Sequence, residues 1–392
     1  MSQTKAFLTI YVSVAISYLG VGLVAPLIAV VLTEHGENSF VVGLIGTTMF
    51  AAFTLASFPI GTLTDRVGPK SILIGGLILY GAAIAMFAMI QVTWLFFIAR
   101  FIEGIGAAGV SVAVETMINQ LSKSNERAQR MSYYALSVGL GWAAGPLTGT
   151  LLFGVYHWLP FIACFAFSLL AALLVSGLVP ETGSDSHHHE HLAQGLSMKL
   201  AVPMSAGAIY GYLMSSLVNL IPIYLQKELQ VSQLQMGLII TSVIIGMLAS
   251  QVPIGRAADR YGKRKTLLFC ASCLAVLFYF IPFITSQYWW HFLIAGALAG
   301  ALAGSLYPIG LAIIGSAVKK EKLGAATSLF SLAFGFGSVV GPSVSGLAMD
   351  ELSDYWLFYL PAILTAAFSV ELIILYKKTA ARRRESAHDS LF

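Results

Sequence analysis

The sequence predicts an all-α membrane protein of 12 transmembrane helices, packed as two six-helix bundles. Hydrophobic residues make up 57% of the chain and charged residues only 10%, whereas soluble domains carry roughly 25% charged residues. A transmembrane helix needs about 20 apolar residues. The 392 residues, joined by short loops, therefore accommodate about twelve spans and no sizeable soluble domain. Two motifs also recur at half the chain length, which divides the spans into two equivalent sets.

Residues 1–179 form the first predicted bundle. Lys5 is the one charged residue before the first apolar run. That run continues well beyond the roughly 7–15 apolar residues of a signal peptide, so we expect a retained span. The six predicted spans cover residues 6–33, 40–62, 71–91, 93–119, 131–154 and 157–179.

A polar linker, residues 180–199, precedes the second bundle, residues 200–376. Its histidine cluster, His187–His191, has the composition of a transition-metal ligand set. A solvated linker is the simpler interpretation, and we predict no metal site and no cofactor. A basic tail, residues 377–392, follows the second bundle. The six spans of the second bundle cover residues 200–226, 232–254, 266–286, 289–317, 324–348 and 355–376.

The distribution of Lys and Arg predicts the orientation. Of the 22 basic residues, 20 lie before the first span, in the loops that follow even-numbered spans, or in the tail. The exceptions are Lys227 and Arg100. Loops rich in Lys and Arg stay in the cytoplasm, so both termini are predicted to be cytoplasmic. This bias explains the formal charge of +4, so the charge does not indicate a nucleic-acid partner.

A charged loop motif occurs in both halves at an offset of 194 residues, once from Pro59 to Lys70 and again from Pro253 to Arg264. Its glycines allow a tight turn between helices. Its charges are suited to latch one half against the other, although a loop that merely follows the topology is the alternative. The predicted latch residues are Gly61, Asp65, Arg66, Gly68, Lys70, Gly255, Asp259, Arg260 and Gly262.

Glu115 is assigned to the same latch. It lies near the cytoplasmic end of the fourth span, within reach of Arg66, Lys70 or Arg127.

A glycine–proline motif occupies the fifth span of each half, with Gly145 and Gly341 separated by 196 residues. Glycines four residues apart let two helices approach closely, and the proline removes one backbone hydrogen bond. The motif predicts either helix packing alone, or a hinge or tight seam where the halves meet. Its residues are Gly141, Gly145, Pro146, Gly149, Gly337, Gly341 and Pro342.

Arg100 and Glu103 are the predicted proton-coupling residues. They lie three residues apart within the fourth span, hence on one helix face. An ionisable residue inside a membrane is a candidate for function. Burial favours a neutral carboxyl group and a nearby guanidinium favours a charged one. A movement that changes their separation therefore binds or releases a proton. A static ion pair that fixes helix packing is the alternative.

These motifs resemble the major facilitator superfamily over essentially the whole chain. Gly61–Lys70 resembles the signature of that family between spans 2 and 3, and the fifth-span motif is similar to that of its drug:proton antiporters. Leu19–Pro26 and Arg100–Ala108 are similar to two further elements of these antiporters, which usually carry glutamine where this chain has Glu103. The YcaD-like branch of bacterial transporters is similar at Glu103 and over Pro253–Asp259.

The resemblance implies the major facilitator fold, in which spans 1, 4, 7 and 10 line a central path. Aromatic cavities with few polar groups suit amphipathic or lipophilic ligands. Each such residue alone is more often a packing residue than a ligand contact, but together they favour an apolar or mixed substrate over a highly charged one. The candidate cavity residues are Tyr18, Tyr210, Tyr212, Asn219 and Tyr307.

The sequence thus predicts a secondary transporter, specifically a proton-coupled exporter of small amphipathic or lipophilic molecules that works by alternating access. An importer or facilitator of a nutrient or metabolite is the alternative. A membrane sensor or scaffold would show no flux. No Walker loop or catalytic Ser/His/Asp spacing is present, so we expect no enzyme. The expected partners are a small-molecule substrate, protons and the lipid bilayer, and we expect a multi-pass monomer in a bacterial cytoplasmic (inner) membrane.

Overall fold

The structure is a computed structural model that describes residues 3–90, 92–122, 126–180, 200–284, 286–318 and 323–389. In these ranges every regular element is a helix, and 12 segments are long and apolar enough to cross a membrane. The predicted all-α class and the 12 spans are confirmed. The His187–His191 cluster of the predicted linker lies outside the described residues.

The N-terminal bundle has α1 at its centre. This helix packs against α5 and α6, while α4 packs against α2 and α3. The helices are apolar on most faces, as lipid-exposed helices must be. They are α1 (Gln3–Glu34), α2 (Ser39–Val67), α3 (Pro69–Met86), α4 (Thr93–Leu121), α5 (Arg127–Val155) and α6 (Leu159–Leu178).

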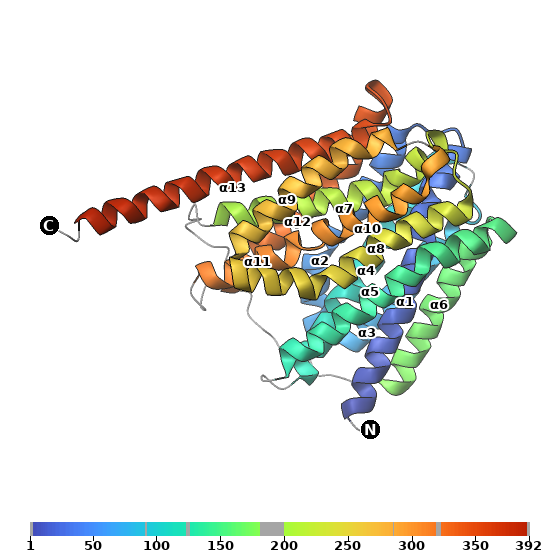
Figure 1. The fold of residues 1–392 in the computed structure, drawn as a ribbon. Helices are drawn as coiled ribbons and strands as arrows, with labels where there is room; N and C mark the ends of the chain where they lie inside the picture. The colour runs from blue at the N-terminus through green and yellow to red at the C-terminus, as the bar shows by residue number, and fades with distance from the viewer. Residues whose placement is uncertain are drawn as a thin grey trace.

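The C-terminal bundle repeats this plan with one interruption. Its tenth span consists of two helices, because the ring of Pro308 cannot fit against the carbonyl group four residues earlier, at Gly304. The last helix continues past the predicted span into the predicted basic tail (Figure 1). The helices are α7 (Ala201–Lys227), α8 (Gln233–Tyr261), α9 (Lys263–Phe280), α10 (Trp290–Ala303), α11 (Leu306–Ala317), α12 (Leu323–Glu351) and α13 (Trp356–Asp389).

Glycines form the two equivalent turns of the loop motif. Gly68 joins α2 to α3 with φ of 90°, and Gly262 joins α8 to α9 with φ of 99°. A side chain is strained in this region of φ. The turn function predicted for the repeated motif is therefore present in both halves.

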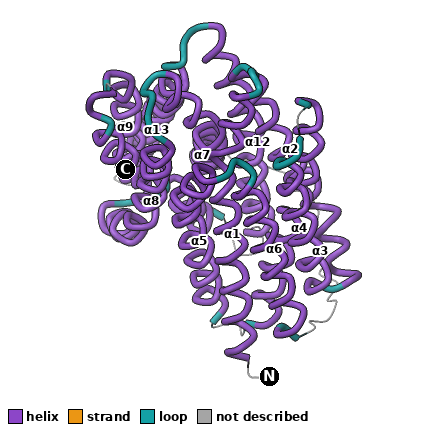
Figure 2. The backbone as a smooth tube through the Cα atoms, turned by 90° about the vertical axis from the view of Figure 1, so that its right-hand side faces the viewer, coloured by secondary structure: helices purple, strands orange, loops and turns teal. Residues whose placement is uncertain are grey.

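The halves lie side by side, with α8, α9 and α13 on one flank and α3, α4 and α6 on the other (Figure 2). They meet where α2 packs against α12 and α5 against α8. Thr47 Oγ1 donates a hydrogen bond to the Val339 carbonyl at 2.8 Å across the α2–α12 seam. Gly43 brings the backbone of α2 against the Pro342 carbonyl, with no room for a Cβ atom.

A carboxylate seals the outermost turn of this seam. The carboxylate of Asp350, in the last turn of α12, accepts hydrogen bonds from the backbone amides of Ser39 (3.0 Å) and Phe40 (2.7 Å). These amides begin α2, where unpaired N–H groups and the helix dipole favour a negative charge. At the opposite end of α2, Leu55 and Phe58 are each 72% exposed. The two halves are therefore held together at the Asp350 end, and their helices diverge toward the opposite end (Figure 1).

Replacing Asp350 with asparagine should loosen this seal. Asparagine offers one neutral acceptor in place of two charged ones, so we expect a loss of about 1–3 kcal/mol from the closed arrangement. Distances between spin labels at Glu34 and Leu352, both exposed at this end, should shift toward longer values. The neighbouring Glu351→Gln serves as the matched control. An unchanged distance distribution in Asp350→Asn would contradict a sealing role.

The fifth-span glycines pack within each half and not between the halves. Cβ atoms at Gly141, Gly145 and Gly149 would collide with the backbone of α1. One at Gly337 would collide with that of α7. The prediction of a half-to-half seam is thus wrong for these glycines. From each proline onward the helix contacts the other half, since Pro146 and Thr150 lie against Gly237 of α8 and Pro342 lies against Gly43 of α2.

Candidate functional site

A buried ion pair lies within α4, about two to three turns from the start of the helix at Thr93. Arg100 Nη1 donates to both carboxylate oxygens of Glu103, at 3.2 and 3.1 Å. Arg100 is 6% exposed and Glu103 is 2% exposed. Both charges are therefore removed from solvent, and each depends on its partner for stabilisation. The structure brings together the pair that the sequence predicted.

The ion pair is tied to the other half of the molecule. Arg100 Nη2 donates to Asn219 Oδ1 at 3.1 Å, from α4 to α7. Asn219 Nδ2 in turn donates to the Ser215 carbonyl at 2.8 Å, which fixes the orientation of the amide. Gly46 of α2 packs against the Asn219 amide, where a Cβ atom would not fit. Asn219, predicted to line the cavity, thus joins the halves through Arg100.

Two aromatic residues complete the surroundings of the pair. The Arg100 guanidinium lies 5.9 Å from the centroid of the Phe87 ring, within cation–π range. Tyr80 of α3 is buried, and its backbone packs against Gly106 of α4, one turn beyond Glu103. Among the described residues, neither the Tyr80 hydroxyl nor Arg100 Nε has a hydrogen-bond partner. The sequence did not single out Tyr80, since a lone tyrosine in an apolar span carries no signal.

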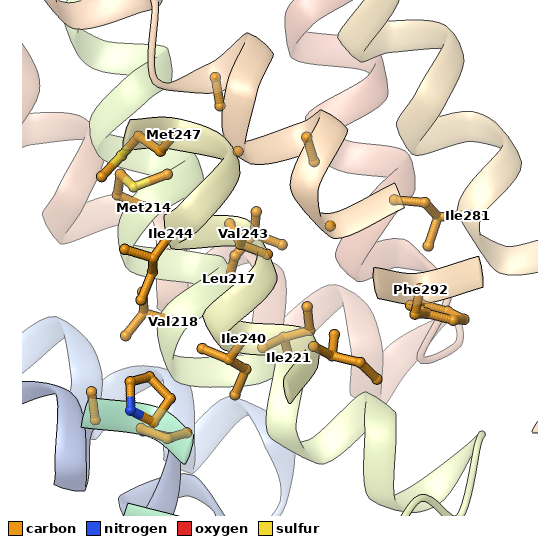
Figure 3. Close-up of a pocket in the computed structure, with 18 of the residues that line it drawn as sticks. Met214, Leu217, Val218, Ile221, Ile240, Val243, Ile244, Met247, Ile281 and Phe292 are labelled. Carbon is orange, nitrogen blue, oxygen red and sulfur yellow. The ribbon is translucent and has the colours of Figure 1, made fainter. Parts of the chain in front are cut away.

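An apolar cavity of about 70 Å³ lies mainly in the C-terminal bundle and reaches α1 and α5 of the other half. Figure 3 shows the labelled methionine, leucine, isoleucine, valine and phenylalanine side chains around it. Apart from the Trp142 indole N–H, its lining carries no hydrogen-bonding side-chain group beyond thioether sulfur. Such a lining suits an apolar ligand group. The labelled residues are Met214, Leu217, Val218, Ile221, Ile240, Val243, Ile244, Met247, Ile281 and Phe292.

The predicted cavity tyrosines divide into two sets. Tyr210 and Tyr307 form an aromatic cluster with Phe334, with ring centroids 5.5 to 5.9 Å apart. The Tyr210 hydroxyl donates to the sulfur of Met247 at 3.7 Å, which links this cluster to the apolar cavity. The Tyr212 hydroxyl instead shares a 2.6 Å hydrogen bond with Ser345 Oγ inside the C-terminal bundle. Tyr212 thus lies away from the apolar cavity described above and lines a second pocket between α7, α12 and α13.

Glu115 and Tyr18 both belong to the N-terminal bundle. Ser111 Oγ donates to Glu115 Oε1 at 3.3 Å within α4, and Tyr18 packs among the partly buried residues of the N-terminal bundle. The ion pairs among described side chains are Arg100–Glu103 and Arg130–Glu126. Glu115 is therefore not latched to a described cation, contrary to its predicted pairing with Arg66 or Lys70.

The other latch residues are likewise apart in this structure. No salt bridge between described side chains involves Asp65, Arg66, Lys70 or Asp259. Arg260 stacks on Tyr261 instead, with its guanidinium carbon 5.4 Å from the ring centroid. Gly61 and Gly255 face open space, so neither makes a close helix contact. Among the described side chains, the predicted latch between the halves is therefore not formed in this structure.

Comparison with known proteins gives one family over the full chain. The sequence profile of the Major Facilitator Superfamily matches residues 10–202 and, a second time, residues 203–390. The uncharacterized MFS-type transporter YfkF of Bacillus subtilis (strain 168) is 27% identical over 386 residues, covering 95% of this chain and 96% of the relative. The uncharacterized MFS-type transporter YcaD of Salmonella dublin is 23% identical over 377 residues, covering 95% and 96%. The resemblance to the YcaD-like branch is thereby confirmed.

Solved structures share the fold at low identity. A mutant of the nucleoside transporter NupG matches with a TM-score of 0.80 and 12% identity, covering 95% of this chain and 100% of that chain. A bacterial homolog of the human lysosomal transporter Spinster, in an inward-facing and unoccupied conformation, matches with a TM-score of 0.73 and 15% identity, covering 95% of each chain. The predicted two-bundle transporter architecture agrees with both.

Proposed function

The chain belongs to the Major Facilitator Superfamily, and from this premise we propose that it is a proton-coupled exporter of small amphipathic or lipophilic molecules. The single observation that carries the proposal is the buried Arg100–Glu103 pair with its link to Asn219. This cluster joins a titratable carboxyl group to the seam at which the halves must separate.

The coupling follows from what happens when the closed end opens. Separation of α4 from α7 breaks the 3.1 Å Arg100–Asn219 hydrogen bond and admits water to Glu103. A proton that neutralises Glu103 releases Arg100, which weakens the bond to Asn219 and favours opening. Protonation and opening thus stabilise each other, as linkage between two equilibria requires. Closure of the same seam buries Glu103 again and favours the paired, charged form.

The apolar cavity supports a lipophilic substrate group. Its lining offers dispersion contacts and few hydrogen bonds, so a sugar or a strongly charged solute would lose its hydration there without replacement. The alternation of Met214 and Met247 with branched aliphatic residues allows the lining to adapt to different shapes.

The membrane orientation belongs to the same proposal. The positive loops place the end of the molecule with Gly68 and Gly262 in the cytoplasm, together with both termini. The structure is then closed toward the outside and open toward the cytoplasm, the state in which an exporter takes up its substrate. We infer a monomer in the bacterial cytoplasmic membrane, since each half already supplies part of the site.

Glu103→Gln tests the coupling. In energised everted vesicles with a pH indicator, a panel of cationic, neutral and anionic amphipathic compounds should include some that dissipate the pH gradient in the presence of the wild-type protein. Glutamine keeps the shape and removes the titration, so we expect at least a tenfold loss of this proton release. Glu126→Gln, which breaks the half-buried Arg130–Glu126 pair, should leave it intact. Full proton release in Glu103→Gln would refute the coupling role.

A further inference from the structure

The Tyr210 hydroxyl lies at the wall of the apolar cavity, where a weak hydrogen bond holds it. It donates to the sulfur of Met247 at 3.7 Å, and Met247 lines the cavity (Figure 3). Within the described part of the chain, this hydroxyl has no oxygen or nitrogen partner. Thioether sulfur is a weak acceptor. The hydroxyl can therefore exchange the sulfur for a stronger acceptor that a ligand brings into the cavity.

The donor of this hydrogen bond is fixed, whereas the acceptor can move. The Tyr210 ring packs against Tyr307 and Phe334, with ring centroids 5.5 and 5.9 Å away, which holds the hydroxyl in place. Met247 lies against Gly304, at the break between α10 and α11, where an added Cβ atom would collide with the methionine side chain. Methionine has three rotatable side-chain bonds. Its sulfur can therefore turn away from Tyr210 when another group takes its place.

The rest of the lining limits the ligand to one chemical class. The lining side chains are aliphatic, aromatic or thioether groups, and Trp142 supplies the other hydrogen-bond donor. No described lining side chain carries a charge or an oxygen acceptor. An ionised group, or a hydrogen-bond donor of the ligand, would therefore lose its hydration there without replacement. A neutral, largely apolar molecule with one hydrogen-bond acceptor matches both the lining and the donor at its wall.

We propose that the Tyr210 hydroxyl selects the ligand of this cavity by donating a hydrogen bond to a ketone, ester, ether or aromatic nitrogen on an otherwise apolar molecule. Met247 occupies the donor while the cavity is empty. This inference rests on the proposed transport function and narrows its substrate class.

Equilibrium binding of a matched ligand pair to the full-length protein in lipid nanodiscs tests the contact. Benzophenone carries a carbonyl oxygen where 1,1-diphenylethylene carries a methylidene group, and the two molecules have nearly the same shape. One phenyl ring of either molecule can enter the cavity while its central group lies at Tyr210. Empty nanodiscs correct for partition into lipid. The selectivity ratio is the dissociation constant of the diphenylethylene divided by that of benzophenone.

Tyr210→Phe removes the hydroxyl and keeps the ring. We expect it to lower the selectivity ratio about fivefold, the effect of one net hydrogen bond. The matched control is Tyr212→Phe, which removes a hydroxyl from the same helix. That hydroxyl bonds to Ser345 away from the cavity, so the ratio should not change.

Met247→Leu separates competition for the donor from a structural role. It removes the sulfur at nearly constant volume, so the selectivity ratio should rise about twofold, opposite to the change in Tyr210→Phe. The carbonyl stretching band of benzophenone gives a second measurement. It should lie at lower frequency with the wild-type protein than in empty nanodiscs, and Tyr210→Phe should remove this shift.

Four results would overturn the proposal. They are a selectivity ratio within twofold of wild type in a folded Tyr210→Phe, a ratio that falls in Met247→Leu, a preference that is lost in Trp142→Phe and kept in Tyr210→Phe, or no binding of benzophenone by the wild-type protein. If Tyr210→Phe does not fold, the direction of the change in Met247→Leu and the carbonyl band with the wild-type protein decide in its place.

This proposal and the proposed function can fail separately, because binding at equilibrium needs no proton gradient. Selectivity that depends on Tyr210 in a protein without proton-coupled flux would refute the proposed function and leave the contact standing. Proton-coupled flux with selectivity independent of Tyr210 would refute the contact alone.

Discussion

Arg100→Met should destabilise the folded protein by about 3–5 kcal/mol, because it leaves the carboxylate of Glu103 buried without a cation. Glu103 is only 2% exposed, so water cannot replace the guanidinium. The same change removes the donor to Asn219, and we expect proton-coupled transport to be lost. Unfolding of the purified protein in mixed micelles, followed by near-ultraviolet circular dichroism, measures the stability.

The double variant Arg100→Met with Glu103→Leu separates stability from coupling. It removes both charges and fills the volume with apolar groups, a replacement that is often neutral or stabilising. We expect it to recover most of the lost stability and none of the coupling. If Arg100→Met alone is as stable as the wild type, Glu103 is uncharged in this state, and the ion-pair description fails.

Local properties of the sequence predicted the spans, the equivalent halves and the ion pair. Hydropathy marks a span because lipid imposes the same requirement along its length, and Arg100 and Glu103 are separated by one helical turn. The Gly68 and Gly262 turns could be predicted for a similar reason, because glycine itself readily adopts the positive φ that these turns require. The interruption between α10 and α11 also has a local cause in Pro308, but proline does not always break a helix in a membrane.

Contacts between segments that are distant in the sequence could not be predicted from such local properties. The Arg100–Asn219 bond joins residues 119 apart in sequence, and the Asp350 seal joins residues more than 300 apart. Both depend on the rotation of helices about their axes and on which end of the molecule is closed. For the same reason Glu115 was assigned to the latch. Its depth in α4 could be read from the sequence, but its neighbours on other helices could not.

Gly43→Val should prevent the closed end from forming while leaving each bundle folded. In this structure a Cβ atom at Gly43 would collide with the Pro342 carbonyl, and backbone cannot yield as a flexible side chain can. The collision is between α2 and α12, which belong to different halves. A conformation in which this seam opens relieves it at little cost to either bundle. We therefore expect labels at Glu34 and Leu352 to report mainly long distances, and transport to fall at least a hundredfold because one of the two alternating states is excluded.

Gly149→Val is the matched control for Gly43→Val. A Cβ atom at Gly149 would collide with the Leu23 carbonyl of α1, but both helices belong to the N-terminal bundle and stay together in either state. Opening the seam cannot relieve this collision, so we expect loss of thermal stability and no shift in the label distances. Gly61→Val, at a position that faces open space, should change neither. A Gly43→Val protein that still closes at the Asp350 end would show that α2 and α12 do not form the outer gate, whereas a shift confined to Gly43→Val identifies this contact as the gate.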